Sequence, residues 1–419
     1  MVDMMIAVQY KNPWPVNGKW AKHLIIECAG LPGNTRRKRV EGFKRFHEVA
    51  AAPGDYAGQW KKKTGGRIMA FLCSYAPEEI LVAANILGYR LLGTQKPILR
   101  ADAHLQSYSC TLVRGVLEEA LAQRLDFIDG IVFPHTCDSI QRLSDIWRMN
   151  LKEGCHMDLV LPVDLTTPAS LDYMTTIMEE FAHDLEQRFD IEITRKDLER
   201  AVSTCNAIRK SVMEIYALRA RVPESIAGGD LHAMVKAGMV MDREEYLTLV
   251  KGLSDELTHR FNVQGQAQDQ ASGLRGKRIV LSGGLCNMPD LFTVIENAGG
   301  AVVMDDLCTG TRFFEGIVEP EENIFRAIAR RYHGRIVCPS KHTGIRARGE
   351  ALVKMVKQSR AHGVMFFCLK FCDPFGFDYP YIKELLDKEG VPSMLFELED
   401  ALLVDGQLQT RCEAFMEML

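Results

Sequence analysis

Twelve cysteines are the residues of this 419-residue sequence whose type most suggests chemistry. Reducing compartments keep thiols unpaired, so metal binding or redox chemistry is favoured over a disulfide framework in a large chain without a secretion signal. The chain has no Cys-x2-Cys pair, the spacing typical of zinc ribbons and ferredoxin-like clusters. Its one close pair is Cys368 and Cys372, in "FFCLKFCDPFGFDYP". Any single cysteine could instead be a small hydrophobic residue of the core. The position of each cysteine relative to the expected strands and helices must therefore distinguish a core residue from a metal ligand.

Six cysteines stand where the loops of a parallel-sheet protein could converge. Four follow apolar runs typical of strands, and two precede helical sequence. Ligands of open parallel sheets bind outside the carboxyl ends of the strands, and the positive end of a helix favours the thiolate that a metal needs. Cys286 is a doubtful case, because it too follows a strand-like run, whereas Cys368 lies mid-run and is expected in the core. The six, three in each half of the chain, are Cys73, Cys110, Cys137, Cys308, Cys338 and Cys372.

Two other kinds of chemistry compete with a metal site. Cys137 has His135 two residues before it and Asp138 directly after it, so a thiol and imidazole couple for nucleophilic catalysis is conceivable. ATP chemistry within this chain is disfavoured, because no G-x-x-x-x-G-K-[ST] loop is present. The stretch "SGGLCNMPD" lacks the lysine of such a loop and is read as a simple turn.

The elements that would position these cysteines follow from alternating strand and helix patterns. Residues 66–170 and 277–419 each alternate short apolar runs with amphipathic stretches, which predicts two α/β domains with parallel sheets. Residues 171–262 read as a helical segment and residues 263–276 as a polar, Gly/Gln-rich linker. Residues 1–65 are mixed and basic. The two α/β regions share a strand, a Cys-Asp step and a following helix, so they are interpreted as distant copies of each other.

Composition excludes several other classes of protein. The net charge is −4 with 47% hydrophobic and 25% charged residues, which gives no indication of a nucleic-acid partner. The beginning of the sequence lacks the basic start and apolar stretch of a signal peptide, and no run approaches about 18 apolar residues. A cytoplasmic protein is the expectation. The basic runs "RRKR" and "KKK" are read as solvated helix faces, with a docking surface for an acidic partner as the alternative.

Taken together, ordered motifs from about Arg67 onward resemble one superfamily, the 2-hydroxyacyl-CoA dehydratases and ATP-dependent benzoyl-CoA reductases. The motifs are "CSYAPEEILVAANILGYRLL", "CTLVRGVLEEAL", "FPHTCDSIQRLSDIWR", "MDDLCTGTRFFEG", "KFCDPFGFDYPYIKELL" and the terminal "GQLQTRCEAFMEML". The resemblance implies two flavodoxin-like domains with an iron–sulfur cluster between them. It also implies a partner, a separate homodimeric iron–sulfur ATPase that delivers electrons at low potential. The subunits of such dehydratases use three cysteines, matching Cys110, Cys137 and Cys372 here.

Three further cysteines in the motifs, Cys73, Cys308 and Cys338, depart from the dehydratase pattern. With these three additional cysteines, the sequence resembles the double-cubane cluster proteins of the same superfamily. In those proteins, six cysteines of one chain hold an [8Fe-9S] cluster. By that resemblance all six cysteines are expected to be cluster ligands, with Cys286 as the alternative to Cys308 or another member. His135, His342 and Arg312 lie close to them in sequence and are the candidate catalytic residues, as donors of hydrogen bonds or protons. Arg114 is a weaker candidate, and a structural role for each of these residues is the alternative.

The leading hypothesis from the sequence is an iron–sulfur reductase that receives electrons from the partner ATPase and reduces a small substrate at a double-cubane cluster. The alternative is a dehydratase or benzoyl-CoA reductase subunit with one [4Fe-4S] cluster. A third possibility is an electron-transfer module or scaffold without a substrate. The resemblance suggests a homodimer, and the sequence does not name the substrate.

Overall fold

Two four-stranded parallel sheets form the frame of the computed structural model, which describes residues 41–151, 154–265, 276–284, 291–335, 338–398 and 405–419. The strand orders are β2-β1-β3-β4 and β6-β5-β7-β8. Both orders match the first four strands of the flavodoxin-like order. The prediction of an α/β protein with two flavodoxin-like parallel sheets is therefore confirmed. The strands are β1 (Arg67–Phe71), β2 (Ile86–Arg90), β3 (Gly130–Pro134), β4 (Cys155–Leu159), β5 (Lys277–Gly283), β6 (Gly300–Asp306), β7 (Gly363–Leu369) and β8 (Ser393–Leu398).

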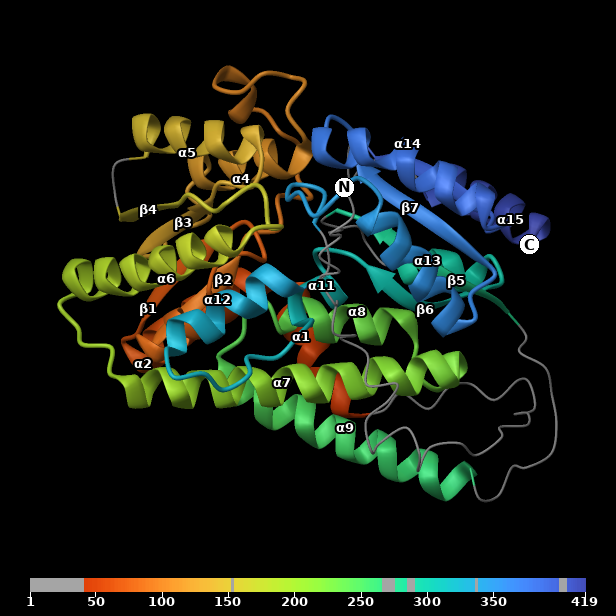
Figure 1. The fold of residues 1–419 in the computed structure, drawn as a ribbon, viewed down its shortest axis with the longest axis horizontal. Coiled ribbons are helices and arrows are strands. Elements are labelled where there is room, and N and C mark those ends of the chain that lie inside the picture. Colours follow the sequence, from red (N-terminus) through yellow and green to blue (C-terminus); the bar gives the residue numbers. More distant parts are fainter. Residues whose placement is uncertain (1–40, 152–153, 266–275, 285–290, 336–337, 399–404) are drawn as a thin grey trace, which may run out of the picture.

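Helices surround both sheets (Figure 1). Those before and within the first sheet are α1 (Lys44–Ala51), α2 (Pro53–Thr64), α3 (Glu78–Ala83), α4 (Thr111–Leu121) and α5 (Asp138–Asn150). The segment between the sheets contains α6 (Pro168–Phe189), α7 (Arg195–Arg221), α8 (Gly228–Ala237) and α9 (Arg243–Gly265). The second half adds α10 (Leu291–Asn297), α11 (Thr311–Phe314), α12 (Ile324–Gly334), α13 (Ala347–Ser359), α14 (Asp373–Lys388) and α15 (Asp405–Met418). Short 3-10 turns are η2 (Glu41–Phe43), η3 (Ala101–Ala103) and η4 (Pro223–Ser225).

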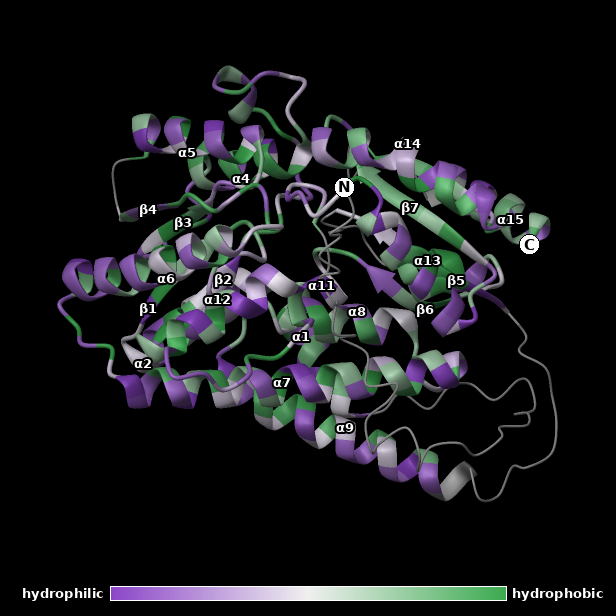
Figure 2. Cartoon of the chain, viewed as in Figure 1, coloured by the Kyte–Doolittle hydropathy of each residue, from purple (hydrophilic) through white to green (hydrophobic). Residues whose placement is uncertain are grey.

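The central strands are mostly buried, because helices cover both faces of each sheet. All five residues of β3 are buried, and six of the seven residues of β5 are buried. Such continuous apolar runs are typical of parallel sheets in α/β proteins. Figure 2 shows the contrast with the outer helices, in which hydrophobic and hydrophilic residues alternate along each helix.

Helix α7 joins the two halves of the molecule. Its beginning is fixed by a capping box, in which the Thr194 side chain accepts the N–H of Asp197 and the Asp197 carboxylate accepts the N–H of Thr194. From there α7 runs beneath both sheets (Figure 1), and it packs against α3 of the first half and β6 of the second. Helix α7 therefore connects the two halves by direct packing. This packing holds the loops at the carboxyl ends of the two sheets at fixed relative positions.

Helix α12 crosses from the second half of the chain to the first. It follows β6 in sequence, yet it packs along α6 beside the first sheet (Figure 1). Its residue Tyr332 is buried and accepts the backbone N–H of Glu78 at 3.2 Å. Because of this crossing, the loop after α12 lies near the first sheet although the sequence assigns it to the second α/β region.

The domain boundaries 1–65, 66–170, 171–262, 263–276 and 277–419 stay predictions. Helix α9 extends beyond residue 262 to Gly265, and the rest of the expected linker up to residue 275 is outside the described residues.

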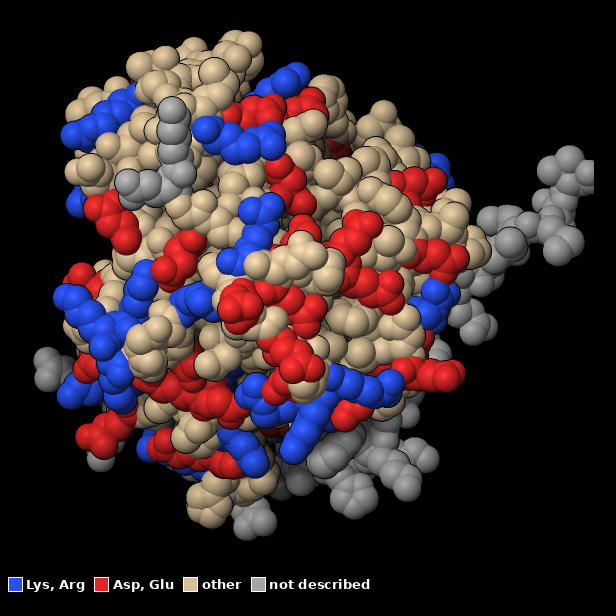
Figure 3. All heavy atoms as spheres, turned by 90° about the vertical axis from the view of Figure 1, so that its left-hand side faces the viewer, with Lys and Arg blue, Asp and Glu red and all other residues tan. Residues whose placement is uncertain are grey.

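Basic and acidic side chains are interspersed on the face shown in Figure 3. In the described part of the chain, no helix combines the length and the apolar character needed to span a membrane.

Candidate functional site

Three of the six candidate cysteines occupy the same local position, the residue directly before a helix. Cys110, Cys137 and Cys372 are the N-cap residues of α4, α5 and α14. Cys137 and Cys372 also follow the third strand of their respective sheets, β3 and β7, and so occupy equivalent places in the two halves. We call these three the helix-cap cysteines. None of the three makes a side-chain capping hydrogen bond, but backbone N–H groups of the first helical turn lower the pKa of each and so favour a thiolate.

Burial opposes this effect of the backbone. It raises the pKa of Cys110, although the backbone N–H groups of Val113 and Leu112 lower it in part. Burial likewise raises the pKa of Cys137 to about 12, and it raises that of Cys372 well above the ordinary value. As free side chains the helix-cap cysteines are therefore neutral thiols at pH 7. A bound metal supplies the positive charge that makes thiolates stable in such surroundings.

The other three candidates, Cys73, Cys308 and Cys338, lie in loops and are called the loop cysteines. Cys73 follows β1, and Cys308 follows β6. Cys338 follows α12 and is buried. Cys73 and Cys308 therefore lie at the carboxyl ends of strands, which is where open α/β folds bind ligands. Cys338 lies in the loop after α12, which is near the first sheet.

The loop that carries Cys308 is built around the carboxylate of Asp305. This buried group accepts the backbone N–H of Thr311 at 2.8 Å and the hydroxyl of Tyr216 at 2.7 Å. Burial raises the pKa of Asp305, and the hydrogen bonds from Thr311 and Tyr216 lower it in part. A Cβ on Gly310 would lie 2.0 Å from Asp305 Oδ1, so only glycine fits that position of the turn. The loop is therefore held in one conformation by buried polar contacts.

The six cysteines converge electrostatically. After burial and one backbone N–H, the strongest influences on the pKa of Cys137 are the thiols of Cys110, Cys73 and Cys338, each of which raises it. Cys308 and Cys110 act in the same direction on Cys372. The helix-cap cysteines and the loop cysteines therefore form one neighbourhood to which both halves of the chain contribute.

No three His, Cys, Asp or Glu side chains of the described residues are grouped closely enough to hold a single metal ion. Thiolates on one tetrahedral ion lie about 4 Å apart, because each metal–sulfur bond is about 2.3 Å long. A cluster of several iron atoms spans a larger space between its thiolates. Six thiols, two of them buried and four half-buried, are a donor set whose chemistry fits an iron–sulfur group.

Of the three predicted catalytic residues, the structure brings Arg312 into contact with a candidate cysteine. Its Nη1 donates to Cys308 Sγ at 3.3 Å, and its Nε donates to Asp306 Oδ1 at 2.6 Å. The guanidinium also lies over the ring of Phe375, 5.3 Å from the centroid. Asp306 and Cys308 raise the pKa of Arg312 despite its burial, so it is a permanent cation beside the thiol.

The two histidines are placed differently. His135 Nε2 lies 2.9 Å from Asp158 Oδ1. His342 has an exposed side chain, and its backbone bonds to the segment around Asp164, with its N–H donating to Val163 O at 2.8 Å. Among the described residues, neither ring makes a hydrogen bond to a cysteine. Arg114, the weaker candidate, pairs with Asp102 at 2.7 Å.

The remaining cysteines are scattered through the molecule. Cys368 is buried within β7, Cys205 within α7 and Cys412 within α15, where each packs as an apolar residue. Cys155 is half-buried at the start of β4. Cys28 and Cys286 are outside the described residues, so the alternative of Cys286 as a ligand stays a prediction.

Sequence reasoning missed three buried basic residues near the loop cysteines: Arg90, Arg335 and Lys341. For Arg90 a signal was present, because it stands inside the apolar strand run "ILGYRLL", where a charged residue needs a buried partner. No comparable signal marks the other two. Their placement depends on the crossing of α12, which brings residues distant in sequence beside Cys73.

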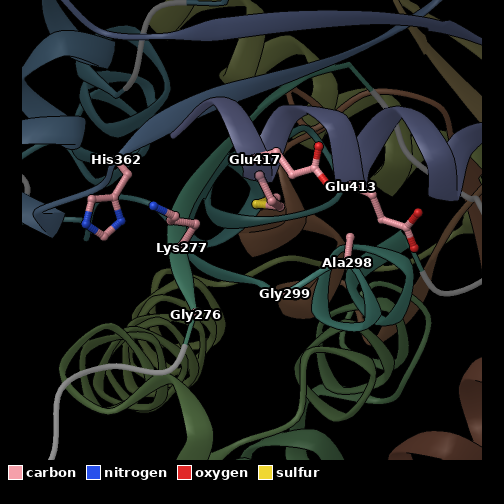
Figure 4. Close-up of a pocket in the computed structure, with 8 residues that line it drawn as sticks. Gly276, Lys277, Ala298, Gly299, His362, Glu413 and Glu417 are labelled. Carbon is pink, nitrogen blue, oxygen red and sulfur yellow. The ribbon is translucent and has the colours of Figure 1, made fainter.

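A surface pocket elsewhere is lined by residues at the opposite edge of the second sheet (Figure 4). Lys277 is the first residue of β5, Gly299 directly precedes β6, and Glu413 belongs to α15. The candidate cysteines Cys308 and Cys372 lie beyond the other ends of β6 and β7. The pocket is therefore separate from the candidate site.

Comparison with known proteins assigns the chain to a family. Residues 73–419 match the family described as "2-hydroxyglutaryl-CoA dehydratase, D-component", and this match includes all six candidate cysteines. The beta subunit of (R)-phenyllactyl-CoA dehydratase from Clostridium sporogenes is 24% identical, over 90% of this chain and 98% of the relative. A subunit of benzoyl-CoA reductase from Thauera aromatica is 29% identical, over 84% and 90%. The beta subunit of lactoyl-CoA dehydratase from Anaerotignum propionicum is 26% identical, over 91% and 100%. The chain belongs to the 2-hydroxyglutaryl-CoA dehydratase D-component family, within the superfamily of 2-hydroxyacyl-CoA dehydratases and benzoyl-CoA reductases.

Proposed function

We propose that this chain is an iron–sulfur reductase that receives low-potential electrons from a partner ATPase and reduces a small substrate at a double-cubane [8Fe-9S] cluster. All six candidate cysteines would hold the cluster. When bound, it would supply one-electron transfer at low potential, which burial and hydrogen bonds to sulfur adjust.

One observation carries the proposal: six thiols from both halves of the chain lie close enough to influence one another electrostatically, two of them buried and four half-buried. The helix-cap cysteines alone would suffice for a smaller cluster. The loop cysteines lie in the same neighbourhood, and one of them, Cys308, accepts a hydrogen bond from Arg312. A single [4Fe-4S] cluster gives this second set no role.

The residues around the thiols would exclude water and hold the ligands in place. Phe375 lies against Arg312 at 5.3 Å and against Arg348 at 4.7 Å, three residues after Cys372. Asp306 accepts hydrogen bonds from both arginines, from Arg312 Nε at 2.6 Å and from Arg348 Nη2 at 2.8 Å. This buried network would tie the start of α14 to the loop of Cys308, so the two ligand positions would stay fixed during electron transfer.

A second candidate function is that of a subunit of a 2-hydroxyacyl-CoA dehydratase or a benzoyl-CoA reductase, with one [4Fe-4S] cluster on the helix-cap cysteines and a CoA thioester as substrate. The names of the curated relatives favour it, because those relatives are subunits of such enzymes. In either case we propose a separate homodimeric ATPase as electron donor, and a homodimer of this chain in the first case. A carrier without its own substrate is the third possibility.

Metal content separates the first two candidates. Protein purified under strict exclusion of oxygen is assayed for iron and acid-labile sulfide per chain. About eight irons support the double cubane, and about four support the dehydratase-like subunit, because one cubane contains four irons. Absence of iron would overturn both candidates.

Turnover separates an enzyme from a carrier. The protein is mixed with an ATPase of the activator type, ATP and a strong reductant, and small substrates and CoA thioesters are offered. Substrate reduction or dehydration that requires ATP supports an enzyme. A cluster that is reduced by the ATPase without any turnover would support the carrier.

A further inference from the structure

Besides Arg312, which pairs with Asp306, three buried basic residues lie near the loop cysteines. Arg90 is 2% exposed, Arg335 7% and Lys341 2%. We call these residues the buried cations. Within the described part of the chain, none of the three forms an ion pair with Asp or Glu. Burying a cation without a counter-charge is costly, so a compensating negative charge is expected at this place.

Each buried cation is anchored beside a loop cysteine. Arg90 Nη1 donates to the backbone carbonyl of Cys308 at 2.6 Å, and its buried Nε has no hydrogen-bond partner. Arg335 Nη2 donates to Ser74 Oγ at 3.1 Å, next to Cys73 in the chain. Arg335 also stacks on the ring of Tyr75, 4.2 Å from the centroid. These contacts hold two guanidinium groups against the loops of Cys73 and Cys308.

Lys341 completes the arrangement. Its Nζ lies 5.8 Å from the centroid of the Tyr75 ring, on which Arg335 also stacks, and donates to the carbonyl of Leu161 at 3.4 Å. Burial lowers the pKa of Lys341, while the nearby thiols of Cys73 and Cys338 raise it.

The helix-cap cysteines have different surroundings. Arg114, the basic residue of α4 nearest to Cys110 in sequence, pairs with Asp102 instead. Arg348, which lies 4.7 Å from the centroid of the Phe375 ring three residues after Cys372, pairs with Asp306 at 2.8 Å and with Asp378 at 2.9 Å. The buried cations thus have no carboxylate partner among the described residues, whereas these basic residues near the helix-cap cysteines are each paired with one.

We propose that the buried cations make the loop cysteines the electropositive half of the site, so that a metal–sulfur group bound there accepts an electron at a higher potential than one bound by the helix-cap cysteines. Positive charge near a redox group stabilises its reduced, more negative state. Reduction adds one electron from a low-potential one-electron donor such as Ti(III) citrate, and no bond to the protein forms or breaks. This inference rests on the proposed double cubane.

The test is a redox titration of anaerobically purified protein, followed by electron paramagnetic resonance. Lys341→Met and Arg90→Met remove one buried charge each. Lys341→Arg keeps the charge, and Lys236→Met is the matched control, because burial also lowers the pKa of Lys236 but no thiol acts on it. We expect the first reduction step of Lys341→Met and Arg90→Met to become at least tenfold less favourable, a shift of about 59 mV to lower potential for one electron. The second step should move less, and the other two variants should titrate like the wild type.

Several outcomes decide between this inference and its alternatives. Wild-type potentials in both charge-removing variants at full iron content would overturn the inference and leave the proposed function standing. About four irons in the wild type would overturn it together with the double cubane. If the charge-removing variants lose iron, retention of iron by Lys341→Arg supports the inference, because the charge is then what holds the group. Loss of iron in Lys341→Arg as well would contradict it.

Discussion

The hydroxyl of Tyr216 donates a hydrogen bond to Asp305 Oδ2 at 2.7 Å, and both side chains are buried. Tyr216 belongs to α7, the long helix beneath both sheets, and Asp305 lies near the end of β6. Because the Asp305 carboxylate also fixes the turn that leads through Cys308 to Thr311, this contact links the helical segment to a candidate ligand loop.

Removal of this donor should weaken both stability and cofactor retention. Tyr216→Phe leaves the buried Asp305 with one hydrogen bond fewer, which we expect to cost about 1–3 kcal/mol. Urea unfolding gives the stability, and iron content after gel filtration gives the retention. Tyr173→Phe is the control, because Tyr173 is 44% exposed and should tolerate the loss of its hydroxyl. Equal stability of both variants would contradict the structural role of the contact.

The turn itself provides a steric test. Gly310→Ala places a Cβ against the Asp305 carboxylate, 2.0 Å from Oδ1, so the turn must open and Cys308 must move. We expect lower stability and loss of part of the iron. Gly58→Ala is the control, because a Cβ at this position in α2 meets nothing within 4 Å. There alanine should stabilise the helix by up to about 1 kcal/mol. Wild-type iron content in Gly310→Ala would show that the turn is not needed.

A buried network of ion pairs between α7 and α3 should contribute strongly to the stability of the protein. Arg209 on α7 pairs with Glu78 and Glu79 on α3, the latter at 2.6 Å. Arg209→Met leaves two buried carboxylates short of a partner, which we expect to cost about 3–5 kcal/mol in urea unfolding. Arg200→Met is the matched control, because its ion pair with Asp197 is exposed and 3.7 Å long. A similar small effect of both substitutions would mean that Arg243, which also pairs with Glu78, compensates.

The pH dependence of stability should include a contribution from His156. Burial lowers its pKa below the ordinary value, despite the nearby Asp158 that raises it. Its Nδ1 is buried without a hydrogen-bond partner, so a proton added there would find no acceptor. Because the folded pKa is the lower one, the unfolded chain binds more protons in this range. Stability is therefore full above about pH 6.5 and is lost as the pH falls through the folded pKa.

Thermal unfolding at pH 7.5 and pH 5.5 measures this contribution. The wild type should lose more stability between these two values than His156→Gln, which has no ring to titrate. His183→Gln is the control, because the His183 side chain is 65% exposed. If His156→Gln and the wild type lose the same stability on acidification, another group is responsible.

The sequence predicts the repeated part of this fold well, because strand runs such as "GIVFP" and "VMFFCL" carry their own signal. Local sequence also predicts Cys137 and Cys372 at the beginnings of helices, since each is followed by Asp and then by helical sequence. The other contacts of the site join residues that are far apart in the sequence. Tyr216 reaches Asp305 across 89 positions and Arg335 reaches Ser74 across 261 positions. Such contacts depend on how helices cross, and no local pattern encodes a crossing.

The stretch "FFCLKFCDPFGFDYP" contains a direct test, because two cysteines four positions apart have different surroundings. Cys368 is buried inside β7, and burial raises its pKa to about 11. The backbone then turns at Phe371, whose positive φ of 63° is uncommon outside glycine, and this turn places Cys372 at the N-cap of α14. Cys372→Ser should remove most of the bound iron, because the serine hydroxyl is a poor ligand for iron. Cys368→Ser should keep the iron and lose only stability. Equal iron content in the two variants would refute the placement of the cluster at Cys372.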